Sequence, residues 1–141
     1  MTPERMADIH ARAMPGARSW SASEYRALTG STGVFTVSIA TSFAIGRAVL
    51  DQVELLLIAT DPEAQRQGLG RKTLRGFEHD AAQRGAQTAF LEVAASNTPA
   101  LRLYSSCGWA QTSRRKNYYR FSDGRREDAL IFEKTLHPTP S

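Results

Sequence analysis

The stretch Gln65-Arg66-Gln67-Gly68-Leu69-Gly70-Arg71 joins an apolar run at 53–60 to a segment with helical spacing that ends near Arg84. Glycines at the start of a helix leave the first backbone N–H groups unobstructed, and those groups have no acceptor within the helix. The helix dipole adds partial positive charge at the same end. The stretch therefore predicts a site for a phosphate-bearing anion. The Walker A and dinucleotide-binding patterns are both absent. A plain strand-to-helix turn with glycines for close packing is the alternative, because short glycine patterns often occur without a ligand.

Helical and extended patterns alternate on both sides of this stretch. Thr2 and Pro3 are typical of a helix start, and Gly85 is typical of a helix end. We expect helices at 2–13, 19–28, 68–84 and 98–106, strands at 34–39, 43–50, 53–60, 88–94, 111–120 and 129–136, and a turn at 122–124. The strand–helix–strand order predicts an α/β fold built on a mixed sheet with right-handed crossovers. We expect one domain over residues 1–136 and a flexible tail at 137–141.

The composition is that of an ordinary globular domain, with 41% hydrophobic and 23% charged residues in 141. A single cysteine, Cys107, excludes an intrachain disulfide and a multi-cysteine zinc site, and the three histidines lie far apart in the sequence. No run is long and apolar enough for a membrane span, and no apolar signal region is present. We therefore expect a cytoplasmic protein with no metal and no membrane partner. The net charge of +4 is too small to predict direct binding to nucleic acid.

Four segments together resemble the GNAT superfamily of N-acetyltransferases. The first is the Q/R-x-x-G-x-G/A segment at 65–70. The second and third, 90–97 and 100–109, include the spacing N-x-x-A-x-x-L-Y-x-x-x-G-F/W. The fourth, 114–119 followed by 123–129, is similar to the bacterial ribosomal-protein alanine N-acetyltransferases of the RimI type. The resemblance covers roughly residues 34–136.

The resemblance implies a GNAT fold with acetyl-CoA as co-substrate, in a cleft where the central parallel strands 53–60 and 88–94 splay apart. Members of the family open with a strand before the first helix, whereas this chain begins with the helix, so we expect that first strand to be missing. The backbone N–H groups of 58–60 are implied to meet the oxyanion, and Asn97 is suited to capping a helix as well. The residues implied to bind acetyl-CoA are Ile58, Ala59, Thr60, Arg66, Gln67, Gly68, Leu69, Gly70, Arg71 and Asn97.

Acetylation of an amine requires a base, because an ammonium has no lone pair with which to attack. Glu92 is the first candidate, since strand alternation places it on the face opposite Leu91 and Val93. A carboxylate in an apolar strand is unusual unless it is paired or functional, and the resemblance makes Glu92 the proton acceptor. A salt-bridged or solvated strand residue is the structural alternative. Glu54, at the start of the preceding strand, is the competing base, because some family members place their base there.

Tyr104 is the candidate acid. The resemblance implies that its phenol protonates the CoA thiolate as it leaves. From spacing alone Tyr104 is better explained as core, because it shares a helical stripe with Ala100, Leu103 and Cys107. The same stripe makes Cys107 a buried structural thiol rather than a nucleophile.

Tyr118 and Tyr119 follow the basic run 114–116, and the resemblance implies that they receive the acceptor. Glu54 is a further candidate on the substrate side, and an exposed hairpin with alternating aromatics is the alternative for the two tyrosines. The predicted function is direct acetyl transfer to the α-amine of a protein N-terminus, with an N-terminal alanine of a small-subunit ribosomal protein implied by the resemblance. Two alternatives stay open: a small-molecule amine acetyltransferase and a CoA-binding sensor without turnover.

Overall fold

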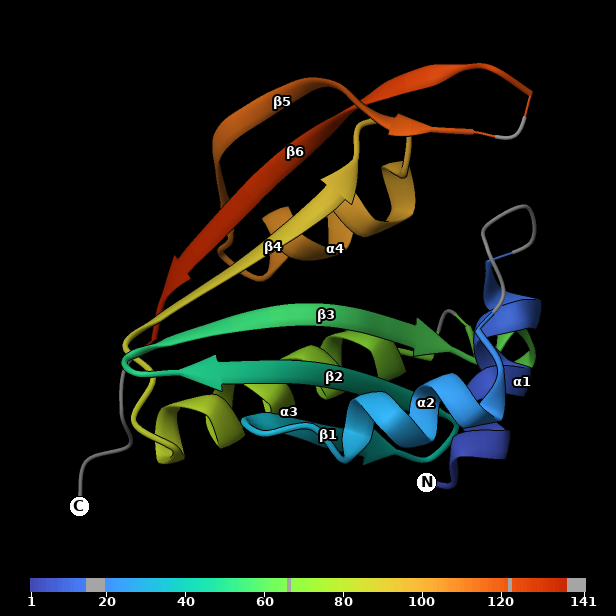
Figure 1. Ribbon diagram of the computed structural model, residues 1–141. Helices are drawn as coiled ribbons and strands as arrows, with labels where there is room; N and C mark the ends of the chain where they lie inside the picture. The colour runs from blue at the N-terminus through green and yellow to red at the C-terminus, as the bar shows by residue number, and fades with distance from the viewer. Residues whose placement is uncertain (15–19, 66, 122, 137–141) are drawn as a thin grey trace.

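The computed structural model describes residues 1–14, 20–65, 67–121 and 123–136 (Figure 1). Within these ranges the helices are α1 (Pro3–Ala13), α2 (Ala22–Thr29), α3 (Leu69–Gln83) and α4 (Thr98–Ser106), with a 3₁₀ turn at Pro62–Ala64. The strands are β1 (Val34–Ile39), β2 (Ser42–Val49), β3 (Gln52–Thr60), β4 (Thr88–Ala94), β5 (Ala110–Arg120) and β6 (Arg126–Thr135). They form one sheet in the order β1-β2-β3-β4-β6-β5. β3 and β4 are parallel and the other neighbours are antiparallel, which confirms the predicted mixed α/β sheet.

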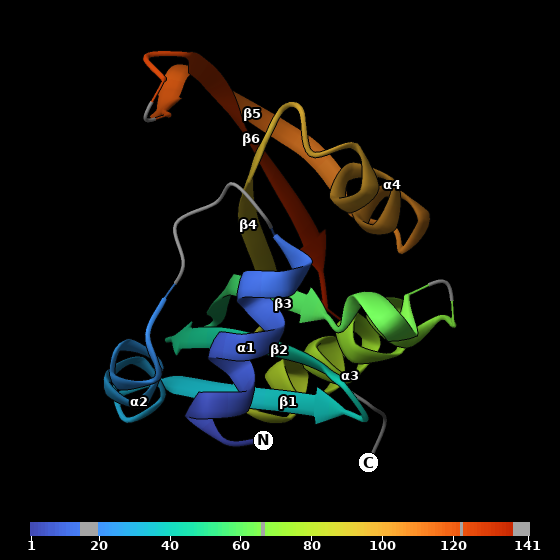
Figure 2. The same cartoon turned by 90° about the vertical axis from the view of Figure 1, so that its right-hand side faces the viewer.

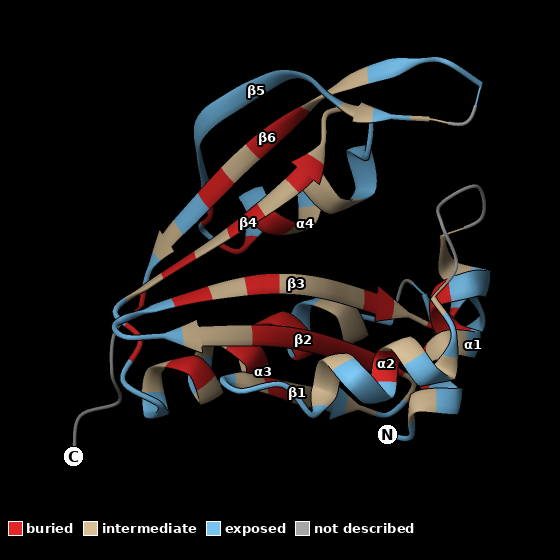
Figure 3. Ribbon diagram, viewed as in Figure 1, coloured by how far each residue is buried: buried red, intermediate tan, exposed pale blue. Residues whose placement is uncertain are grey.

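Helices cover both faces of the sheet (Figure 2). α3 packs on β1, β2 and β3, and its predicted apolar stripe, Leu74, Phe77 and Ala81, is fully buried. α4 lies on the same side as α3, whereas α1 and α2 lie on the opposite side. Figure 3 shows buried positions along β2, β3, β4 and β6, while β5 is exposed along almost its whole length.

α3 approaches the sheet closely at Gly46 of β2. The rings of Phe35 and Phe77 stack there, with centroids 5.7 Å apart and planes 4° apart. A Cβ atom on Gly46 would lie 2.5 Å from Cε2 of Phe77 and 2.9 Å from Cζ of Phe35. Glycine at this position therefore makes room for the stacked pair at the centre of the larger core cluster.

β3 and β4 pair only over a short distance within the described residues. Register pairs join 52–54 of β3 to 88–90 of β4, and beyond them the strands separate (Figure 1). This confirms the splayed central strands. β3 also carries a bulge: Ile45 of β2 pairs with Leu57 and Gly46 pairs with Leu55, so Leu56 has no partner on β2. The separation and the bulge together open the sheet at its centre.

The helix starts follow local signals. Thr2 caps α1 and Asn97 caps α4, as predicted, by accepting hydrogen bonds from backbone N–H groups. α2 begins at Ala22 rather than at residue 19, because Ser21 and Glu24 form a capping box. The predicted start itself lies outside the described residues. Residues 1–14 contain no strand before α1.

β6 is longer than predicted. It begins at Arg126 rather than at Ala129, because the end of β5 continues the ladder and pairs with residues 126 and 127. Residues 126–128 are all charged, so no apolar alternation marked this part of the strand. The predicted turn is supported at Gly124, whose φ is +87° and whose N–H donates to the carbonyl of Phe121. Ser122 of that turn and the predicted tail, 137–141, lie outside the described residues.

Candidate active site

A cavity of about 730 Å³ opens where β3 and β4 separate. Its walls come from α1, the middle of β3, the end of β4, α4 with its cap, and the end of β5. Segments far apart in the sequence therefore meet at one place. The predicted site residues that line the cavity are Ile58, Glu92, Asn97, Tyr104 and Tyr119.

Glu92 faces this cavity from the middle of β4. Leu91 and Val93 on either side are buried in the core, so the predicted alternation of faces is confirmed. The Glu92 side chain is 24% exposed and forms an ion pair with Arg115, with an N–O distance of 3.6 Å. Glu92 is thus salt-bridged, as the structural alternative required, and also accessible from the cavity.

Tyr104 of α4 belongs to the core and to the cavity wall at once. Its ring lies against Trp109 and Phe132, with centroids 6.1 and 6.2 Å away, and the residue is 6% exposed. Burial raises the pKa of its phenol above the ordinary value of 10, and the neighbouring Tyr119 raises it further. The phenol is therefore protonated throughout the neutral pH range.

The two adjacent tyrosines of β5 have different surroundings. Tyr119 lines the cavity, and burial followed by the charge of Glu92 raises its pKa. Tyr118 is 49% exposed and lies beneath the guanidinium of Arg115, 5.2 Å from ring centroid to Cζ, outside the cavity lining. Of this predicted pair, only Tyr119 is placed to meet a ligand in the cavity.

A bulge in β5 determines which of the two tyrosines faces the cavity. Residues 116–118 face a single residue of β6, Asp128, because Arg115 pairs with Ala129 and Tyr119 pairs with Glu127. The Asp128 carboxylate accepts a 2.9 Å hydrogen bond from the backbone N–H of Asn117, which has a φ of +52°. It also forms a 3.3 Å ion pair with Arg114. Asp128 therefore holds the bulge that aims Tyr119 inward.

Glu54, the competing base, lies outside the main cavity. It lines a separate cavity of about 90 Å³ together with Arg47 and Phe90. Burial raises the pKa of its carboxyl, and the charge of Glu92 raises it further. Glu54 therefore lies outside the main cavity but close enough for the charge of Glu92 to act on its carboxyl.

The start of α3 has the open backbone that the sequence predicted. Gly68 is the N-cap with a φ of +76°, and α3 has no side-chain cap, whereas α1, α2 and α4 each have one. A Cβ on Gly70 would lie 3.7 Å from both Leu103 and Thr60, an ordinary contact distance, whereas a Cβ on Gly68 would have no neighbour within 4 Å. Arg71 donates a 2.9 Å hydrogen bond from Nη2 to Oγ of Ser106 in α4. Arg66 lies outside the described residues.

The end of β3 is held against α3 by a chain of hydroxyl groups. Oγ1 of Thr73 donates to Oγ of Ser42, which is 2.9 Å from Oγ1 of Thr60. Ala59 packs into the smaller core cluster, and Ile58 alone of this predicted triplet lines the cavity. The predicted triplet thus divides into a core residue, an anchored residue and a cavity residue.

Several cavity residues were missed by sequence reasoning. His10 and Met14, at the end of α1, form part of one wall, and Arg120 and Phe121 form part of another. The spacing of His10 contained no metal or catalytic motif, so no local signal distinguished it from an ordinary core histidine. Only the packing of α1 beside β3 brings it to the cavity.

No helix within 1–14, 20–65, 67–121 and 123–136 is long and apolar enough to cross a membrane. No group of three or more histidine, cysteine, aspartate or glutamate side chains in those ranges is arranged to hold a metal ion.

Comparison with protein families gives a match over most of the chain. The model of the acetyltransferase (GNAT) family matches residues 8–109. The [ribosomal protein bS18]-alanine N-acetyltransferase of Escherichia coli (strain K12) is 49% identical over 90 residues, which cover 64% of this chain and 60% of that protein. The enzyme of the same name from Haemophilus influenzae is 39% identical over 89 residues, covering 63% and 60%. The aligned part thus spans about three fifths of the length of these curated relatives.

Solved structures extend the likeness to nearly the whole chain. The crystal structure of the ribosomal-protein-S18-alanine N-acetyltransferase from Escherichia coli superposes with a TM-score of 0.83 at 35% identity, covering 99% of this chain and 90% of that one. Arabidopsis thaliana NAA60, in complex with a bisubstrate analogue, superposes with a TM-score of 0.80 at 16% identity, covering 96% and 94%. At that identity the second likeness shows the fold alone.

Proposed function

The chain belongs to the acetyltransferase (GNAT) family, and from this premise we propose that it transfers an acetyl group from acetyl-CoA to the α-amine of a protein N-terminus. The proposed acceptor is the N-terminal alanine of ribosomal protein bS18, the substrate in the names of its relatives from Escherichia coli and Haemophilus influenzae. The observation that carries the proposal is the meeting of Glu92, Tyr104 and Tyr119 at one cavity between separated strands. Amine acylation requires a base for the amine and is assisted by an acid for the leaving thiolate.

The residues at the start of α3 fit the pyrophosphate of acetyl-CoA. Gly68 and Gly70 leave the first amides of the helix without a side-chain cap, and the helix dipole favours an anion there. Arg71, in the first turn of α3, is one proposed cation, and Arg66 is the second. Acetyl-CoA supplies the acetyl group as a thioester. Backbone N–H groups of the segment 58–60 on β3, which lies beyond the last pair with β4, would stabilise negative charge on the carbonyl oxygen.

Glu92 is the proposed base. Its carboxylate takes a proton from the acceptor ammonium, directly or through a water, and frees the nitrogen lone pair. An α-amine loses its proton at a pKa of about 7.7–8.0, against about 10.4 for lysine, so the demand on the base is smaller for a protein N-terminus. Arg115 is 55% exposed, so an incoming ammonium can displace it as the partner of Glu92.

Tyr104 is the proposed acid. As the new carbon–nitrogen bond forms and the carbon–sulfur bond breaks, the phenol of Tyr104 donates its proton to the leaving sulfur and then regains one from solvent. Burial disfavours both the phenolate and the thiolate, so the cavity raises the pKa of donor and acceptor together. Overall the acceptor ammonium loses two protons, one to Glu92 before the attack and one as the amide forms; CoA gains one, and one is released to solvent.

The test is acetyl transfer from labelled acetyl-CoA to three matched peptides, with the modified atom located by mass spectrometry. One peptide has a free N-terminal alanine, one has a blocked terminus and an internal lysine, and one has a free terminus of another residue. We expect transfer to free α-amines, with the alanine peptide the better substrate. Intact binding of acetyl-CoA without transfer to any peptide would overturn the proposal in favour of a small-molecule acceptor or a CoA sensor.

A further inference from the structure

His10 is a buried titratable residue in the cavity wall that the proposed reaction does not use. It is 5% exposed and lies near the end of α1. Figures 1 and 2 place this part of α1 beside the carboxyl end of β3, on the face of the sheet opposite α3 and α4. The proposed acetyl-CoA site lies at the start of α3. His10 therefore reaches the cavity from the side left for the acceptor.

The hydrogen bond between His10 and Tyr25 determines which ring nitrogen carries the proton. Nδ1 of His10 lies 2.6 Å from the phenol oxygen of Tyr25, a residue with no exposed surface. Burial lowers the pKa of His10 and raises that of Tyr25, so both groups are neutral near pH 7. If Nδ1 carried the proton, the phenol hydrogen of the buried Tyr25 would have no acceptor among the described residues. The phenol therefore donates to Nδ1. The imidazole proton is therefore on Nε2.

The Nε2–H group opens to the cavity. Nε2 has no hydrogen-bond partner among the described residues. Every fully buried side-chain nitrogen or oxygen atom of the described residues does have a partner, so Nε2 is not fully buried. Nε2 is therefore not sealed in the core but reachable from the cavity that His10 lines. The rings of Trp20 and Tyr25 contact the imidazole edge-on, with centroids 6.2 and 6.0 Å away, and hold its orientation.

We propose that Nε2–H of His10 donates a hydrogen bond to the first peptide carbonyl of the acceptor, and so selects α-amines that carry a neighbouring amide. The inference rests on the proposed function. A protein N-terminus has a carbonyl one carbon from its amine, whereas a lysine ε-amine and a simple alkylamine have none. An acceptor without that carbonyl would leave an oriented donor unpaired, which a site built for hydrogen bonding disfavours. Tyr25 is the positioning residue, because it holds the proton on Nε2.

The experiment compares two acceptor peptides that differ in one atom. Both begin with alanine, and in one the first peptide bond is a thioamide, whose sulfur is a weak acceptor. We expect the wild type to prefer the normal amide by about tenfold in kcat/KM, the effect of one hydrogen bond. His10→Phe should lose most of that preference and His10→Gln should regain part of it. Tyr25→Phe should reduce the preference, because either ring nitrogen can then carry the proton. His79→Gln, at an exposed position of α3, is the matched control and should match the wild type.

The outcomes separate this inference from the proposed function. If the wild type acetylates neither peptide, the proposed function fails. If the wild type acetylates both, and His10→Phe keeps the wild-type ratio of amide to thioamide, the role of His10 is overturned and the function stands. Circular dichroism and acetyl-CoA binding check the fold of each variant. Should His10→Phe not fold, an unchanged ratio in Tyr25→Phe together with an increased ratio in His10→Gln overturns the inference.

Discussion

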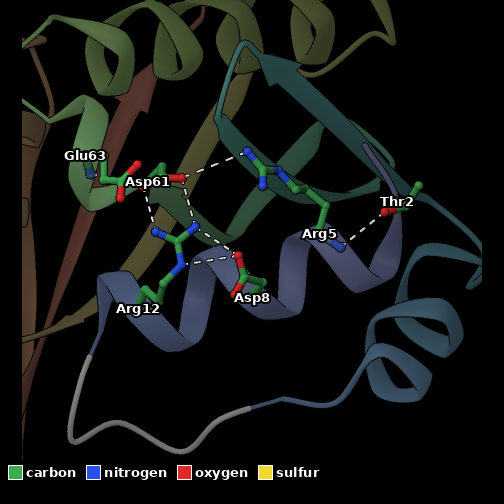
Figure 4. A network of polar contacts seen from close by, with 6 residues as sticks. All are labelled: Thr2, Arg5, Asp8, Arg12, Asp61 and Glu63. Atoms are coloured by element: carbon green, nitrogen blue, oxygen red, sulfur yellow. Dashed lines mark hydrogen bonds and ion pairs between the residues drawn. The ribbon is translucent and has the colours of Figure 1, made fainter.

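Arg12 holds Asp61 through two hydrogen bonds of 2.8 Å, one from Nη1 and one from Nη2 to the two carboxylate oxygens (Figure 4). Asp61 is 5% exposed and follows the last residue of β3, whereas Arg12 is in the last turn of α1. Asp8 accepts two further bonds from Arg12, one from Nε and one from Nη2, and the backbone N–H of Glu63 donates to Asp61. This network ties α1, the helix that carries His10, to the end of β3 beside the cavity.

We predict that Arg12→Ala lowers the midpoint of urea unfolding in a pH-dependent way. Arg12, followed by the backbone N–H of Glu63, lowers the pKa of Asp61 from 3.8 to about 2. A carboxyl with a lowered folded-state pKa stabilises the fold above its unfolded pKa, and this stability is lost as the pH falls toward 2. The difference between wild type and variant should therefore be largest above pH 5 and shrink below pH 4. A difference that stays constant down to pH 2 would contradict the role given to Asp61.

Substitution of the two candidate bases should have unequal effects. We expect Glu92→Gln to lower kcat by about 10²- to 10⁴-fold, the usual contribution of a general base, and to leave acetyl-CoA binding intact. Glu54→Gln is the matched variant and should retain most of the activity, because Glu54 lines a different cavity. Steady-state kinetics with an alanine peptide decide between them. The reverse ranking would make Glu54 the base.

Tyr104→Phe should lower kcat by about 100-fold, with Tyr118→Phe as the exposed control. For the wild type, kcat/KM should rise with pH and level off as the acceptor α-amine loses its proton at about 7.7–8.0. Activity needs the protonated phenol, so a fall is expected only as the pH rises through the pKa of Tyr104, which burial and Tyr119 raise above 10. A wild-type decline near pH 9 that is absent from Tyr104→Phe would show that the phenol loses its proton at a lower pH than predicted, and would contradict the raised pKa of Tyr104.

Gly70→Ala separates folding from ligand binding. The added Cβ would meet Leu103 and Thr60 at an ordinary 3.7 Å, and alanine favours a helix over glycine by about 1 kcal/mol. We therefore expect thermal stability to stay equal or rise, while the Kd for acetyl-CoA increases about tenfold as amide contacts are lost. Calorimetric titration measures the affinity, and Gly30→Ala, at the end of α2, controls for a general effect of the substitution. Unchanged affinity would remove Gly70 from the proposed pyrophosphate site.

Gly46→Ala tests the closest approach of α3 to the sheet. The new Cβ would clash with the stacked rings of Phe35 and Phe77, so we expect a loss of about 1–3 kcal/mol in the free energy of unfolding. The double variant with Phe35→Leu should recover part of that loss by making room. If the single variant is as stable as the wild type, the helix can shift without cost.

Local signals in the sequence specified most of the fold. The caps at Thr2 and Asn97, the stripe of α3 and the alternation around Glu92 each depend on residues within one or two turns or along one strand, so they could be read directly. The start of β6 at Arg126 could not, because a charged strand segment lacks alternation and forms only by pairing with β5.

The candidate site was predicted only in part, because long-range packing decides which residues meet. Adjacent tyrosines would point to opposite faces of any strand, but which one faces the cavity depends on a bulge held by Asp128 from the next strand. His10 carried no motif, and its place follows from the docking of α1 through Arg12 and Asp61. The roles of Glu92 and Tyr104 stay predictions that the kinetics above test.

Where β3 and β4 part, two open sheet edges face each other inside the molecule. Beyond residue 54 of β3 and residue 90 of β4, the backbone N–H and C=O groups on the facing sides of the two strands no longer pair with each other. Such edges are templates for another extended chain, and they are costly to leave unpaired away from water. The gap between the two strands is therefore a position where a strand-like ligand can bind. A narrow ligand with amide groups of its own could pair with both edges and bridge the two halves of the sheet, so amide hydrogen exchange on both edges should slow when it binds.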